Sequence, residues 1–208
     1  MIPNEPLTRP GFISKARFSG HHIYDFEFAT GSITRTSDPS KLLLSRDAKA
    51  AGQGVLSLSA SGQTFLYLQA LADSGSATLT FSSPGYISRQ ATVNFYPSGF
   101  VFNQTVQNTT KTNPFQFGVS LVPILPSSVV NNGQQSLRGG LAPVAVALVS
   151  SQPAVGTLKP ATLTFNPGDN FANATFTPAA IGNTIVTITP PAGFGIPAVP
   201  SQLVITVN

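Results

Sequence analysis

The sequence contains no cysteine and no tryptophan, one methionine and two histidines. Without cysteine, the protein has no disulfides and no thiolate metal sites. Charged residues are also scarce, at 9% of 208 residues, against roughly 25% in an average soluble protein. Solubility must therefore come from serine, threonine, asparagine, glutamine and the backbone, which is unusual for a cytosolic enzyme.

The few charges do not form a patch. Eleven basic and seven acidic residues give a net charge of +4, and the excess is spread over both halves of the chain. Nucleic-acid binding needs lysine and arginine clustered on one face, and no such cluster is present. We therefore expect no nucleic-acid partner.

Long apolar runs are absent as well. No uninterrupted run approaches the 18 residues that indicate a membrane span, so we expect no membrane insertion. Residues 1–12 lack the apolar core of a signal peptide. If the protein is exported, we expect this chain to be a fragment of a longer precursor.

Catalytic motifs are missing too. The chain has no Gly-x-Ser-x-Gly elbow, no phosphate-binding glycine loop and no His-Glu-x-x-His. After Pro97 it has no histidine and no glutamate, which removes most acid–base and nucleophile pairs. We predict that the protein is not an enzyme and uses no cofactor.

What the sequence does contain is an internal repeat at an offset of about 107 residues, and such a repeat fixes the architecture before anything else. The matched positions are Gly62 with Gly168, Phe65 with Phe171, Gly75 with Gly182, and Pro84–Tyr86 with Pro191–Phe194. The repeat predicts two domains, residues 1–97 and 98–208, joined at Tyr96–Gly99. Each has a common domain size.

The local pattern predicts β-strands throughout. Short alternating runs are separated by clusters rich in glycine and proline, with 18 of each in the chain, which is typical of β-sandwiches. Ala77, Leu79 and Phe81 share one strand face, and their repeat partners keep this phase, so the same positions are expected to face the core. The other predicted strands are Ile23–Phe28, Lys41–Ser45, Val55–Ser59, Thr64–Ala70, Ala91–Tyr96, Phe100–Phe102, Val144–Val149, Ala161–Phe165, Phe171–Phe176, Thr184–Thr189 and Leu203–Val207.

Several stretches resemble a known family. They are SDPSKLLLS (37–45), the segment from Phe65 to Tyr86, ATVNFYPSGFVF (91–102), and SLRGGLAPVAVALVSSQPAVGTL (136–158) with IGNTIVTITPPAGF (181–194). Together they resemble bacterial immunoglobulin-like (Big-type) repeats, which occur in tandem in large secreted or surface proteins. The resemblance implies an all-β fold of two tandem immunoglobulin-like β-sandwiches, without catalytic residues. Ala77 stands where such folds carry a tyrosine, so the tyrosine corner is absent.

From this resemblance we expect a structural spacer module pair from a large extracellular or cell-surface bacterial protein, adhesin-like or stalk-like. Its partners would be neighbouring repeat domains, and strand edges could mediate self-association. Two alternatives stay open: a fibre or sheath subunit, and a module that binds a ligand or glycan through its loops. Two polar segments, Gln104–Asn113 and Asn131–Gly140, are predicted to lie at the surface. The candidate loop contacts are Ser136, Leu137, Arg138, Gly139, Gly140 and Asn108.

Two clusters carry metal-ligand chemistry, and both have a simpler interpretation. His21-His22 lies near Asp25 and Glu27, but adjacent residues of a strand point to opposite faces, so the two histidines would not share an ion. Asp169-Asn170 lies in a turn beside Gly168, where an aspartate that forms the turn is expected rather than a calcium ligand. We predict no metal site.

Some bacterial surface domains carry a covalent bond between a lysine and an asparagine, which needs both side chains buried beside an acid. Lys15 and Asn94, with Asp25 or Glu27, are the candidates in the first domain. Asn94 is out of phase with Ala91, Val93 and Phe95, so we expect its side chain to face solvent, which speaks against the bond.

Overall fold

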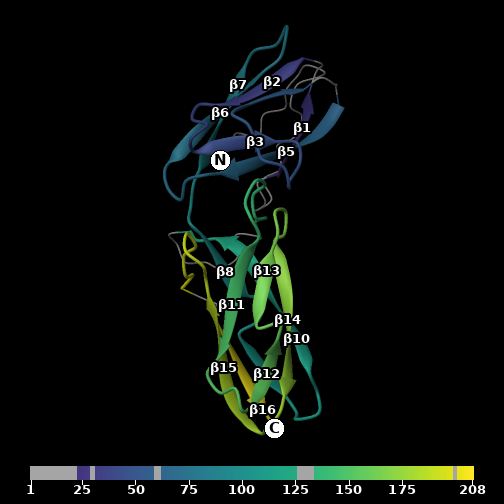
Figure 1. Cartoon of the computed structure of the whole chain (residues 1–208). Helices are drawn as coiled ribbons and strands as arrows, with labels where there is room; N and C mark the ends of the chain where they lie inside the picture. The colour runs from purple at the N-terminus through teal and green to yellow at the C-terminus, as the bar shows by residue number, and fades with distance from the viewer. Residues whose placement is uncertain (1–22, 29–30, 59–61, 126–133, 199–200) are drawn as a thin grey trace. The chain divides into compact units, whose positions relative to one another are not determined.

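The computed structural model describes residues 23–28, 31–58, 62–125, 134–198 and 201–208 (Figure 1). In this part of the chain all regular structure is β-strand. The chain divides into two compact units between Phe95 and Tyr96, and Arg138–Gly140 group with the first unit. The break predicted after Pro97 lies two residues further along.

The second unit is built from two sheets (Figure 1). The first sheet has the order β12-β14-β10-β8, with strands Gly156–Lys159, Phe171–Pro178, Phe115–Pro123 and Ser98–Phe102. The second has the order β13-β11-β15-β16-β9, with strands Thr162–Phe165, Val144–Ser150, Gly182–Thr189, Gln202–Val207 and Val106–Thr109. Neighbouring strands are antiparallel except β16 and β9, which are parallel. This order is that of an immunoglobulin-like sandwich, with the first strand divided between the two sheets.

The first unit also has two sheets. One has the order β1-β5-β3, with strands Ile23–Phe28, Gly62–Ala70 and Leu42–Ser45. The other has the order β4-β2-β6-β7, with strands Val55–Leu58, Ser32–Thr36, Ser76–Ser82 and Arg89–Asn94. Both sheets contribute to one buried core, so this unit is a sandwich as well.

The two units share one strand topology. Taking β1 to β7 in order against β10 to β16, every pairing of the first unit recurs in the second. Strands β5, β6 and β7 of the first unit therefore correspond to β14, β15 and β16. Strands β8 and β9 have no counterpart among the described residues of the first unit. The sequence repeat is thus a repeat of topology.

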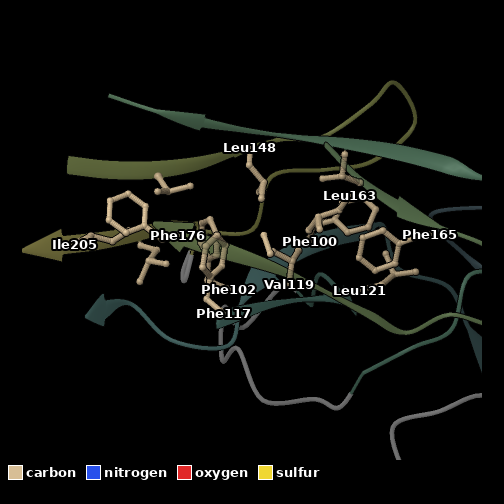
Figure 2. Packing of buried hydrophobic residues seen from close by; sticks show 14 of the residues in the cluster. Phe100, Phe102, Phe117, Val119, Leu121, Leu148, Leu163, Phe165, Phe176 and Ile205 are labelled. Atoms are coloured by element: carbon tan, nitrogen blue, oxygen red, sulfur yellow. The ribbon is translucent and has the colours of Figure 1, made fainter. Parts of the chain in front are cut away.

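The core of the second unit is rich in phenylalanine (Figure 2). The ring of Phe100 on β8 lies 4.9 Å, centroid to centroid, from Phe165 on β13, and 4.9 Å from Phe194. Phe115 and Phe176 lie 5.6 Å apart in the same cluster. Aromatic pairs of this geometry contribute beyond their buried area. The Phe100–Phe165 contact joins the two sheets, whereas Phe115 and Phe176 are neighbours within one sheet.

The core of the first unit is mainly leucine. Leu42, Leu44, Leu66 and Leu68 from the β1-β5-β3 sheet are buried. Opposite them, strand β6 buries alternate residues and partly exposes those between, as the sequence predicted. Its counterpart β15 buries Thr184 and Val186, so the phase is kept across the repeat.

Three strands of the second unit, β9, β10 and β12, were not predicted from the sequence. The polar stretch Gln104–Asn113 was predicted as surface without a strand, yet Val106–Thr109 forms β9. A polar stretch can do so at the edge of a sheet, where two of the four β9 side chains are exposed while the backbone pairs with β16. Strand β10 was not predicted, although Phe117, Val119 and Leu121 on it are fully buried.

A serine after β2 and another after β11 make the same pair of hydrogen bonds in the two units. The backbone N–H of Ser37 donates to the carbonyl of Thr78 (2.8 Å), and the N–H of Thr78 donates to Ser37 Oγ (2.9 Å). Ser151 repeats this with Ile185, at 2.9 Å for both bonds. We call this arrangement the serine bracket. Because each serine precedes the crossing to the other sheet, the bracket sets the point at which the chain leaves the strand.

Removing either bracket hydroxyl should loosen only its own unit. Ser37→Ala and Ser151→Ala each remove the acceptor of one backbone N–H, so we expect each to lower the free energy of unfolding by about 1 kcal/mol. Amide hydrogen exchange followed by NMR should show faster exchange at Thr78 for the first variant and at Ile185 for the second. Ser57→Ala, at an exposed position on β4, is the control. Unchanged exchange at both amides would show that the bracket is incidental.

Candidate interaction surface

The predicted loop around Ser136–Gly140 is less open than expected. Leu137 is only 3% exposed and belongs to the core of the second unit. Its N–H donates to the carbonyl of Asp169, and its own carbonyl accepts the N–H of Gly168, both at 2.8 Å. The side chain of Leu137 is therefore not a ligand contact, because it packs inward where a surface loop was predicted. Ser136 beside it is half-buried.

The remaining loop candidates are on different elements. Arg138, Gly139 and Gly140 group with the first unit. Asn108 is exposed, but it lies on strand β9 opposite Thr206 and not in a loop. The structure thus does not unite the six residues in one site of the second unit.

The turn at Asn166–Asp169 is held by its own aspartate. Asp169 Oδ2 accepts the backbone N–H of Asn166 (2.8 Å) and its side-chain Nδ2–H (3.0 Å), and Gly168 takes a φ of 91°. This is the turn-forming role that the sequence predicted. Among the described residues, no three His, Cys, Asp or Glu side chains are placed to share an ion.

The other candidates can be placed only in part. His21, His22 and Lys15 lie outside the described residues. Asp25 and Glu27 are in strand β1. Asn94 on β7 is exposed, as its phase predicted, so it is not placed to form a buried covalent bond. Within the described chain, no helix has the length and apolarity that crossing a bilayer requires.

Replacing Asp169 separates its turn-forming role from the calcium alternative. Asp169→Ala removes both acceptor contacts to Asn166, so we expect the second unit to lose about 1 kcal/mol of stability. Asp169→Asn keeps a carbonyl acceptor and should lose less. Thermal unfolding in calcium and in a chelator should give the same midpoint for the unmodified chain. A metal site would be established instead if calcium raised the unfolding midpoint of the unmodified chain but left that of Asp169→Ala unchanged.

The most distinctive surface was not predicted from the sequence. It is the outer face of the sheet β13-β11-β15-β16-β9, which we call the neutral face because none of its outward side chains is charged. Burial alternates along these strands and identifies the outward residues. They are Thr162, Thr164, Ala145, Ala147, Val149, Asn183, Ile185, Thr187, Thr189, Gln202, Val204, Thr206, Val106 and Asn108.

An apolar row crosses this face. Ile185 on β15 lies opposite Val204 on β16, and Val204 lies opposite Val106 on β9. Their side chains are 37%, 37% and 59% exposed. Val149 on β11 is 50% exposed and lies opposite Thr187, which makes it a diagonal neighbour of Ile185. Cross-strand neighbours at such positions have their side chains in reach of one another. The row is therefore a continuous exposed stripe of β-branched side chains.

The corresponding positions of the first unit are polar. Thr78 pairs with Thr92 as Ile185 pairs with Val204, and the serine bracket places Arg35 where the second unit has Val149. The same fold therefore forms with threonine and arginine at these places. Because the fold does not require apolar residues there, their presence in the second unit needs another explanation.

Comparison with known proteins gives distant likenesses only. No family model and no curated protein match the chain. Domains 4 and 5 of the S-layer protein SbsC are 14% identical with a TM-score of 0.38, over 85% of this chain and 76% of that one. Domains 5–6 of SbsC are 12% identical with a TM-score of 0.32, over 98% of each chain. A beta-glycosidase from Bacteroides vulgatus is 12% identical with a TM-score of 0.35, over 96% of this chain and 24% of that one. Likenesses of this degree carry no argument about what the chain does.

Proposed function

We propose that the chain is a non-catalytic pair of structural modules that bears tension within a larger extracellular or cell-surface bacterial repeat protein of the Big-type. The repeated topology supports the modular part of the proposal, because tandem units of one fold extend a chain by a fixed step. The sparse charge, 9% of the residues, supports an exposed role outside the cytosol. The absence of histidine, cysteine and glutamate after Pro97 supports the non-catalytic part.

The observation that carries the proposal is the parallel pair β9–β16. The chain enters the second unit through β8 and β9 and leaves it through β16. Because β9 and β16 run in the same direction, tension along the chain pulls them in opposite directions along their length. Their hydrogen bonds are then loaded in shear, together rather than one after another.

The bonds that bear this load extend to both ends of the pair. The N–H of Val204 donates to the carbonyl of Thr105 at 2.8 Å, and the N–H of Asn208 donates to the carbonyl of Thr109 at 3.0 Å. Beneath them, Ile205 and Val207 of β16 are buried in the core. The closing strand is thus held by both its backbone and its side chains, as a module that transmits force requires.

Single-molecule pulling between handles at the two ends of the chain tests this role. We expect two separate unfolding events, each releasing roughly 35 nm for a unit of about 100 residues. In a parallel ladder the backbone N–H groups of alternate residues point to the neighbouring strand, and on β9 the N–H of Gln107 points to β16. Gln107→Pro removes this N–H, so it should lower the unfolding force of the second unit. A single event, or none above the noise, would refute the load-bearing proposal.

The matched control is Asn108→Pro. The N–H of Asn108 points away from β16 by the same alternation, so this variant introduces a proline into β9 without removing a donor to β16. We expect its unfolding force to remain close to that of the unmodified chain. Equal weakening by the two prolines would show that the β9–β16 ladder does not bear the load.

A further inference from the structure

We propose that the neutral face is a contact between copies of this chain, at which the second unit packs against the same face of a second copy. The proposal rests on the proposed function in one respect: a protein displayed in many copies or repeats can use a contact that is weak by itself. It concerns outward side chains, including those of β9 and β16, and not the backbone hydrogen bonds between these two strands, so the two proposals can fail separately.

The first step is the contrast between the two units. Ile185, Val204 and Val149 are exposed and apolar, while the equivalent residues of the first unit are Thr78, Thr92 and Arg35. Threonine has nearly the shape of valine, so the change between the units at Val204 is mainly one of polarity. Contiguous exposed apolar residues that folding does not require mark an interaction surface.

The second step selects the occupant. A charged ligand would need opposite charges, and the neutral face carries none. A sugar would favour aromatic side chains for stacking, and the face has no aromatic residue. A surface without charge is its own electrostatic complement, whereas a surface of one sign repels its copy. A second neutral face is therefore the partner that these residues fit best.

The third step concerns geometry. In a two-fold symmetric contact, a residue that meets a second residue of the partner has its own copy met by that second residue in turn. Consider a two-fold axis that lies between the two faces and runs along the apolar row through Val204. It brings the apolar row against itself and places the row of Thr187 and Gln202 against that of Asn183 and Thr206. Hydroxyl and amide groups then meet groups that can donate to and accept from them. Two sheets packed in this way lie about 10 Å apart with interleaved side chains.

The size of the face predicts a weak contact. Five strands about 4.8 Å apart, each of about six residues, cover on the order of 500 Å² per copy. The total of about 1,000 Å² lies below that of standard stable complexes. We therefore expect reversible association at high protein concentration, which strengthens when several copies are tethered together.

Methyl NMR and sedimentation of the full chain over rising concentration test the proposal. We expect a monomer–dimer equilibrium, with concentration-dependent shifts at the methyl groups of Val106, Val204 and Ile185. Val149→Arg installs the residue that the first unit carries at this position, so the fold should tolerate it. Because the arginine would place an unpaired charge in a contact that is otherwise neutral, we expect at least tenfold weaker association. Val55→Arg, at a valine that is 48% exposed on β4 of the first unit, should leave association unchanged.

A second variant guards against a local effect of arginine. The double change Ile185→Thr and Val204→Thr again copies the first unit and should also weaken association, with the fold verified by amide NMR spectra. A strict monomer at the highest concentration, or undiminished association of both variants, overturns the proposal. Shifts of the same methyl groups caused in dilute protein by added chito-oligosaccharide, without dimerisation, would assign the face to a glycan instead. If the chain stays monomeric but still shows two unfolding events in the pulling experiment, the contact proposal fails and the load-bearing role stands.

Discussion

The second unit depends on burying phenylalanine between two sheets that no disulfide joins. Phe100 shows how this works, since its ring contacts Phe165 of the opposite sheet and Phe194 of the segment between β15 and β16. With no cysteine in the chain, the inward row of each strand must supply the cohesion that disulfides provide in many exported domains. This requirement explains why alternation is strict on β13 and β16, where one residue out of phase would move a core side chain into solvent.

The inward rows are also the part of the fold that the sequence reveals best. The residues of β6 and β15 that face the core could be predicted because each strand has one buried face and one solvent-exposed face. Strand β10 escaped prediction because small residues occupy its outward positions. Gly118 and Ser120 are buried there, and Gln134 Nε2 donates to Ser120 Oγ at 2.8 Å, so the covered face resembles a turn sequence. Strand β9 escaped because an edge strand can be polar on both sides and still pair through its backbone.

The neutral face could not be predicted in the same way, because no single segment contains it. Val106, Ile185 and Val204 become neighbours only when the order of β15, β16 and β9 is known. A partial signal was nevertheless present. Alignment of the repeats places Arg35 against Val149 and Thr92 against Val204, and such a change of polarity at exposed positions identifies residues that the fold leaves free. Leu137 was misjudged for the opposite reason: it looked like part of a polar turn, and only the structure shows its side chain entering the core.

The parallel pair β9–β16 also constrains when the second unit can fold. Strand β9 lies near the beginning of the unit and β16 at its end, and β16 is the strand that connects β9 to β15 in the sheet. While the last strand is still being synthesised, the five-stranded sheet lacks the member that joins β9 to the rest. Contacts between such distant segments form late and slowly. The five-stranded sheet therefore cannot be completed until β16 is available to join β9 to β15.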